Sequence, residues 1–278
     1  MGTRAERWIA TIPGLADHAL RVEYARSELY ALEDQILTES LEQVCRRAER
    51  TDPPAREVMM AWVPVVVDAQ HVERIATVRA LGHELGLEGL GRLLACSTPS
   101  GHLPPARAMG EDQAKQQASH GTLSHRDGRP LTLGERRALA RSPSRAVLVK
   151  LLRDPHPMVV RLLLANPRLT EQDVVRMAAR RPISAPVVCE IAKTWIRQAG
   201  IRRAIVLNPG TPPAVSVPLL ALMSRPELRQ VAQAMDVGPI VRSLAHEIAE
   251  LRPPPQEQGS DGASPVALDC STEGLEPQ

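Results

Sequence analysis

The sequence predicts an all-α protein in which a small helical N-terminal domain is followed by a short α-solenoid. Apolar residues recur at spacings of three and four, and in the second half a helical segment ends three times at a proline stop. The 278 residues are 43% hydrophobic but include no Phe, two Tyr and three Trp. A core of Leu, Val, Ile, Ala and Met suits thin helical layers better than β-sandwiches.

The first long segment, about residues 15–50, contains no Pro or Gly and predicts a single long helix. Its apolar stripe runs from Val22 to Ile36 and then shifts register at Leu37. We expect this helix to pack within its own domain. Homodimerisation through residues 15–50 is the alternative.

Further helices complete a domain that spans residues 1–96. Asp52 and the two prolines after it end the long helix and begin the next, which has a place for a kink at Pro64. A third apolar pattern ends near Gly86, and a short one follows Gly89. The segment therefore predicts a small domain of three to four helices, with a net charge of −4.

Two segments lack helical periodicity. Residues 97–130 are dominated by Ser, Gly, Pro, Gln and His, which predicts a flexible linker, and we expect His102, His120 and His125 to be solvated rather than to bind a metal. Residues 253–278, the acidic tail, carry five acidic and no basic side chains and are expected to be disordered. The apolar run 266–268 within the tail is a candidate docking element.

Residues 131–252 contain the repeated pattern. Helical segments end at Pro143, at Asn166-Pro167 and at Asn208-Pro209, because proline lacks an amide hydrogen and disfavours helix in the residue before it. The first step between prolines is 24 residues and the second is 42, and an additional helix containing Trp195 accounts for the surplus of 18. Within the second unit, Thr170 is expected to cap a helix with Asp173 in its first turn.

The repeats resemble a known family. The run 160–167, Val-Arg-Leu-Leu-Leu-Ala-Asn-Pro, with its continuation to Arg181-Pro182, resembles the leucine-rich repeat variant, a bacterial relative of HEAT-type α-solenoids. Residues 137–155 and 203–223 are similar, so the resemblance covers about residues 131–235. It implies a right-handed stack of short helices without catalytic residues. Some members of this family carry an N-terminal cysteine cluster that holds an iron-sulfur centre; this chain has no such cluster, so we expect no cofactor.

The net charge of +2 conceals an excess of ten positive charges in residues 131–252. This excess favours an anionic partner. We therefore expect a non-enzymatic scaffold whose basic surface binds an acidic protein, and the acidic tail is a candidate to mask that surface. The alternative is nucleic-acid binding of the kind that HEAT-like DNA alkylation-repair glycosylases perform. The candidate partner-binding residues are Arg161, Arg168, Arg176, Arg180, Arg181, Trp195, Arg202 and Arg203.

No compact catalytic or metal-binding motif emerges from the sequence. His71, His83 and Glu84 do not have the spacing of a metal site. An enzyme that uses Trp195 with Asp173 or Glu190 is a weaker interpretation than a core role for the tryptophan.

The four cysteines, Cys45, Cys96, Cys189 and Cys270, are scattered, and the longest apolar run, 58–67, is too short to span a bilayer. These features predict a cytoplasmic protein with reduced thiols, no metal and no membrane insertion.

Overall fold

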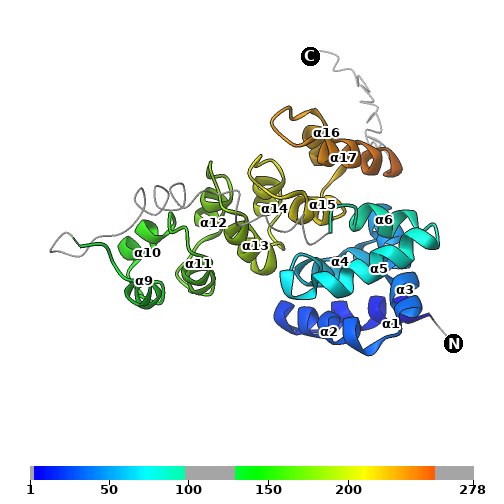
Figure 1. Ribbon diagram of the computed structural model, residues 1–278, viewed down its shortest axis with the longest axis horizontal. Coiled ribbons are helices and arrows are strands. Elements are labelled where there is room, and N and C mark those ends of the chain that lie inside the picture. Colours follow the sequence, from blue (N-terminus) through cyan, green and yellow to red (C-terminus); the bar gives the residue numbers. More distant parts are fainter. Residues whose placement is uncertain (1–2, 98–128, 254–278) are drawn as a thin grey trace, which may run out of the picture.

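The computed structural model describes residues 3–97 and 129–253, and within these two ranges the chain forms helices and no β-strand (Figure 1). The all-α prediction is therefore confirmed for the described residues. The predicted linker and the acidic tail lie almost entirely outside them. The first range contains α1 (Arg4–Thr11), α2 (His18–Ala31), α3 (Asp34–Glu49), α4 (Pro53–Val66), α5 (Val72–Glu84) and α6 (Glu88–Leu93), with short 3-10 turns after α1 and α4.

The helix α1 was not expected from the sequence, although its start carries a recognisable signal. Thr3 accepts a hydrogen bond from the amide of Glu6, and the Glu6 carboxylate accepts one from the amide of Thr3. This reciprocal capping box satisfies two amides that the first turn leaves without helical partners. Trp8 of α1 then packs against Trp62 of α4, with ring centroids 5.0 Å apart, at the centre of the N-terminal core.

The single long helix predicted for residues 15–50 is wrong, because the chain breaks into α2 and α3 at Leu32 and Glu33, both of which have extended backbone angles. Arg74 of α5 explains the break. Its guanidinium donates to the carbonyls of Leu29 and Leu32 and also pairs with Asp34 in the first turn of α3. These bonds satisfy carbonyls at the end of α2, so the chain can turn there at little cost.

The apolar stripe of α3 is covered within the chain. Leu37, Leu41, Val44 and Ala48 are fully buried, and α3 contacts α1, α4, α5 and α6. Ile36, at the end of the first stripe, is 43% exposed, so homodimerisation through residues 15–50 stays a prediction that the structure does not support. The predicted kink residue Pro64 lies inside α4, and Gly86 ends α5 with a φ of +64°.

The second range forms a layered array that extends to one side of the N-terminal helices (Figure 1). Its helices are α9 (Leu133–Leu139), α10 (Arg145–Leu151), α11 (Pro157–Leu164), α12 (Glu171–Ala178), α13 (Ala185–Thr194), α14 (Ala199–Val206), α15 (Pro213–Leu220), α16 (Arg225–Gln233) and α17 (Pro239–Leu251). In Figure 1, α9, α11 and α13 form one row, and α10, α12 and α14 form the other. Contacts between α9 and α11, α11 and α13, and α12 and α14 hold the rows together.

The two asparagines of the repeated pattern make the same bonds in different rows. Asn166, after α11, donates through Nδ2 to the carbonyls of Ala140 and Ser142 at the end of α9, at 2.9 and 3.0 Å. Asn208, after α14, donates to Ala178 and Arg180 at the end of α12, at 2.7 and 2.8 Å. Each asparagine therefore ties the end of its own helix to the end of the preceding helix in the same row.

The unequal steps between the repeats have a simple structural cause. Two helices, α10 and α11, separate the proline stop at Pro143 from the one at Pro167, whereas three helices, α12 to α14, separate Pro167 from Pro209. Helices alternate between the two rows along the chain. Three helices instead of two therefore place the third proline stop in the other row. The additional helix is present as α13, but it ends at Thr194, so Trp195 lies immediately after the helix and not within it as predicted.

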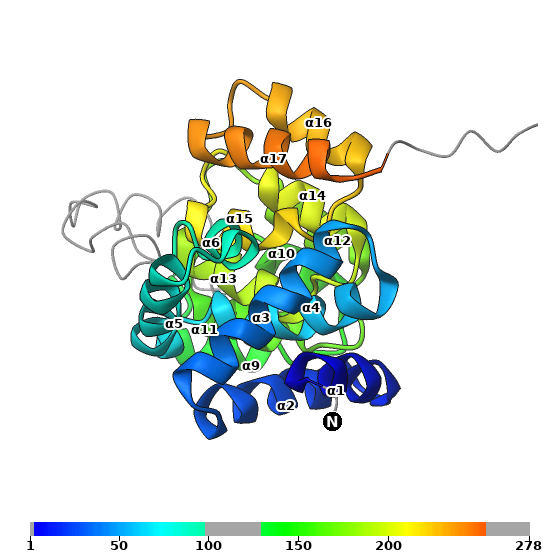
Figure 2. The same cartoon turned by 90° about the vertical axis from the view of Figure 1, so that its right-hand side faces the viewer.

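The N-terminal helices pack directly on the array. The buried helix α4 contacts α13 and α15, and Lys193 forms an ion pair with Asp68 at 3.0 Å. Arg92 of α6 reaches Glu247 of α17 at 2.9 Å. Figure 2 shows the outcome: α16 and α17 lie at one edge of the molecule, and α1 and α2 lie at the opposite edge.

Candidate binding groove

Two of the predicted partner-binding arginines bond to buried groups of the chain, although the Arg161 side chain is itself 54% exposed. Arg161 of α11 forms a bidentate pair with Glu190 of α13, at 2.8 and 2.9 Å, and these bonds raise the pKa of Arg161. Arg202 is buried and donates to the carbonyls of Ile196 and Arg197; burial lowers its pKa. Both side chains therefore stabilise contacts between helices and loops.

The arginines that remain differ in their surroundings. Arg168 and Arg176 are exposed and form no ion pair with a described residue. Arg180 is half-buried, and its pKa is lowered by burial and by the neighbouring charge of Arg153. Arg181 and Arg203 are exposed and line the same groove.

This α12–α14 groove has a volume of about 400 Å³. The residues that line it are Val175, Ala179, Arg181, Gly200, Arg203, Ala204, Leu207 and Asn208. Arg181, Arg203 and Asn208 were predicted from the sequence, whereas the small aliphatic side chains between them were not. Their signal is a second spacing of four between small or aliphatic residues, Val175 with Ala179 and Gly200 with Ala204, outside the main core stripe.

The groove exists because two parallel helices meet through small side chains. Asn208 holds the end of α14 to the end of α12, while Gly200 at the start of α14 lies beside Glu171 at the start of α12. A Cβ added at Gly200 would lie 3.5 Å from the Glu171 carboxylate and 3.7 Å from Val175. Glycine and alanine on α14 therefore leave a furrow that longer side chains would fill.

The charge along the groove is unequal. Glu171 lies near the Gly200 end. Arg181 makes a 3.1 Å bond to Asp236 and a 3.3 Å bond to the carbonyl of Leu207, and Arg203 has no ion pair among the described residues. Because Arg181 and Asp236 are both more than half exposed, water screens their attraction and a competing carboxylate can replace Asp236 at small cost.

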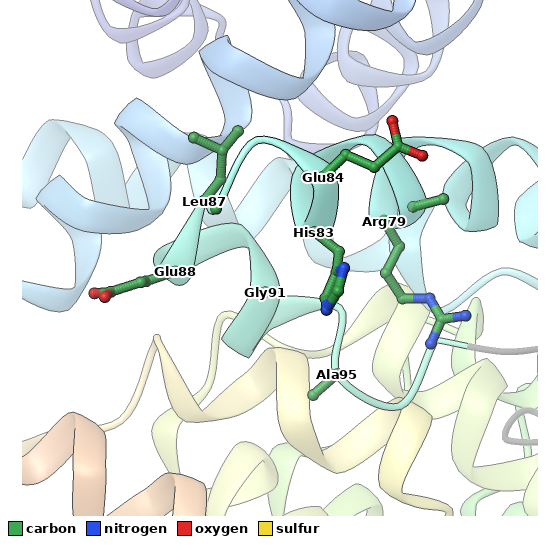
Figure 3. Close-up of a pocket in the computed structure, with 10 residues that line it drawn as sticks. Arg79, His83, Glu84, Leu87, Glu88, Gly91 and Ala95 are labelled. Atoms are coloured by element: carbon green, nitrogen blue, oxygen red, sulfur yellow. The ribbon is translucent and has the colours of Figure 1, made fainter.

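A second hollow lies between α5 and α6, with a volume of about 790 Å³ (Figure 3). Arg79, His83, Glu84 and Glu88 provide its charged lining, and Leu87 and Ala95 are among the apolar residues around them. Figure 3 shows His83 and Arg79 on the side of Ala95, with the Glu84 carboxylate directed away from them. Its lining has two carboxylates and one guanidinium group, so this hollow does not attract an anionic partner.

The histidines considered as metal ligands have separate surroundings. His83 lines the second hollow, whereas His71 is buried, with its Nδ1 2.8 Å from the Tyr30 hydroxyl. Burial lowers the pKa of His71, and the nearby Asp68 opposes this shift. Within the described ranges, no group of three or more His, Cys, Asp or Glu side chains is arranged to hold a metal ion.

The side chains of the enzyme interpretation serve contacts between helices. Trp195 is half-buried and donates to the carbonyl of Leu164 at 3.1 Å. Asp173 forms the predicted capping box with Thr170, which is confirmed, and is bound by Arg145 of α10. Hydrogen bonds from Arg145 and Thr170 lower the pKa of Asp173 to about 2.

None of the helices in residues 3–97 and 129–253 has both the length and the apolar character needed to cross a membrane. Comparison of the chain with protein-family models, curated proteins and solved structures finds no match.

Proposed function

We propose that this chain is a non-enzymatic interaction scaffold, in which the helices from α9 onward form a short right-handed solenoid of the leucine-rich repeat variant or HEAT type. Packing within each row, together with the equivalent bonds of Asn166 and Asn208, supports this architecture. In this proposal the α12–α14 groove binds an acidic segment of a partner protein in the cytoplasm.

The observation that carries the proposal is the combination of two exposed guanidinium groups with a small aliphatic floor. Arg181 and Arg203 can each receive a carboxylate, whereas Val175, Ala204 and Leu207 offer an apolar surface of limited depth. A peptide with acidic and small aliphatic side chains matches both features. The phosphates of a duplex would use the guanidinium groups but would leave the aliphatic floor without a contact.

Binding of a fluorescein-labelled peptide in which Asp alternates with Val and Ala tests this proposal by fluorescence anisotropy. The protein is the full-length chain with the five carboxylates of residues 254–278 replaced by amides, so that the acidic tail does not compete. We expect Arg203→Glu to weaken binding at least about tenfold, equivalent to about 1.4 kcal/mol. Arg168→Glu, at an exposed arginine outside the groove, is the matched control and should bind within about twofold of the parent.

Filling the floor of the groove gives a test that does not change charge. Ala204→Phe should weaken the same peptide because the larger ring occupies the furrow. Circular dichroism of each variant checks that the helices remain folded. Equal affinity of the parent, Arg203→Glu and Ala204→Phe proteins would reject the groove. Binding of duplex DNA with a steep salt dependence, in the absence of peptide binding, would favour the nucleic-acid alternative instead.

A further inference from the structure

The α12–α14 groove has a candidate occupant within the same chain. The acidic tail carries Glu257, Asp261, Asp269, Glu273 and Glu276 and no basic residue. In this tail, Val266, Ala267 and Leu268 precede Asp269 directly. A run of aliphatic side chains followed by a carboxylate is the chemistry that the floor and the arginines of the groove can accept.

The tail starts within reach of the groove. Asp236 bonds to Arg181 at the rim of the groove, and α17, which follows, has 13 residues and a length of about 20 Å at ~1.5 Å per residue. With the extended residues at either end of α17, Pro253 therefore lies at most about 40 Å from Asp236. The 13 residues from Pro253 to Val266 can span about 43 Å when extended.

The charges favour this occupant over the second hollow. The groove presents Arg181, whose ion pair with Asp236 is exposed, and Arg203, which has no ion pair with a described residue. The hollow between α5 and α6 presents Glu84 and Glu88 beside its basic groups and would repel a carboxylate. Of these two hollows, the α12–α14 groove is therefore the one that favours an acidic segment.

We infer that residues 266–269 of this chain bind in the α12–α14 groove and compete there with the partner segment. This inference depends on the proposed function of the groove and adds its regulation. A tethered segment has an effective concentration of about 1 mM. If the tail segment binds the groove with an intrinsic Kd of about 0.1 mM, it would lower the apparent affinity of a competing peptide about tenfold. Partner binding then displaces the tail.

Chemical crosslinking of the full-length chain tests the inference, because Cys270 follows Asp269. Ala204→Cys places a second thiol on the groove floor, and Ala80→Cys places one in the second hollow as the matched control. Both variants also carry Cys96→Ser and Cys189→Ser, since both thiols are only half-buried. Cys45 is buried, and burial raises the pKa of its thiol, so it should react slowly.

With a short bismaleimide, we expect the Ala204→Cys variant to form an intramolecular crosslink to Cys270 several-fold faster than the Ala80→Cys variant. Mass spectrometry of the monomer band identifies the linked peptides. Addition of Arg181→Glu and Arg203→Glu to the Ala204→Cys variant should remove the difference. Equal crosslinking of the two variants, or crosslinks found only between two chains, would overturn the inference.

Peptide binding separates this inference from the proposed function. If replacement of the tail carboxylates by amides increases the affinity for the labelled peptide about tenfold, both stand. If the peptide binds equally with and without the tail carboxylates, and no groove crosslink forms, the tail inference fails while the proposed function stands. If no peptide binds even when the tail carboxylates are replaced, the proposed function fails and the tail inference fails with it.

Discussion

Asn208 offers the sharpest test of how the array is held together. Its Nδ2 donates to the carbonyls of Ala178 and Arg180, and its Oδ1 accepts from the amide of Gly210 at 3.0 Å. The side chain is buried between the ends of α12 and α14. Substitution Asn208→Ala removes all three bonds and leaves two helix-end carbonyls without a protein donor.

The expected loss of stability follows from these three hydrogen bonds. Each contributes about 1 kcal/mol net, so Asn208→Ala should lower the free energy of unfolding by about 3 kcal/mol. At a typical 2–4 °C per kcal/mol for a chain of roughly this size, the thermal midpoint should fall by about 6–12 °C. Asn208→Asp should cost at least as much, because a carboxylate would replace the donor and face two carbonyl oxygens.

Urea unfolding followed by far-UV circular dichroism measures both variants. Gln230→Ala, at an exposed position on α16, is the control and should change the unfolding free energy by less than about 0.5 kcal/mol. If the unfolding free energy of Asn208→Ala differs from that of the wild type by no more than the control does, the asparagine bonds do not hold the array together and the reasoning is refuted.

Three other predictions concern buried charged groups and thiols. Arg92 bonds to the buried Glu49 at 2.7 and 2.9 Å. In urea titrations, Arg92→Met should therefore lower the free energy of unfolding by about 3 kcal/mol, and a second substitution, Glu49→Gln, should restore part of this loss. No restoration would contradict the pairing. Arg145 holds the pKa of Asp173 at about 2, below its ordinary 3.8, so the fold favours the ionised carboxylate. The stability advantage of wild type over Asp173→Asn is therefore present above pH 3.8 and should disappear as the pH falls through about 2 in pH-dependent urea titrations; a constant difference would contradict this. Partial burial raises the pKa of Cys189 to about 11, so iodoacetamide labelling of Cys189 at pH 8 should be slow until urea unfolds the chain, and fast labelling of Cys189 in the native protein would contradict this raised pKa.

Local patterns in the sequence predicted most of the helix ends. The Thr170 cap, the stop at Asn208-Pro209 and the presence of an additional helix between residues 183 and 200 depend on residues near one another in the chain. The break at Leu32 depends instead on Arg74, more than forty positions away. The register shift at Leu37 was its only local sign, and a shift in register does not by itself distinguish a break from a continuous helix.

The binding groove was predictable only in part. The charge excess directed attention to Arg181 and Arg203, but the same criterion also selected Arg161 and Arg202, which the fold uses internally. Sequence cannot separate these cases, because the partner of Arg161 is Glu190 on another helix of the row. The pairing of α12 with α14 was also hidden, since it required knowing which row each helix joins.

A charge exchange between Arg203 and the labelled peptide tests the central claim, binding in the α12–α14 groove, most directly. The experiment measures the affinities of wild-type and Arg203→Glu chains, both with amides in place of the tail carboxylates, for the Asp-containing peptide and for its counterpart with Lys in place of Asp. The account predicts that Arg203→Glu loses affinity for the Asp peptide and gains affinity for the Lys peptide, because the carboxylate and the cation exchange places across one contact. Equal affinity of the two chains for each peptide would contradict the claim.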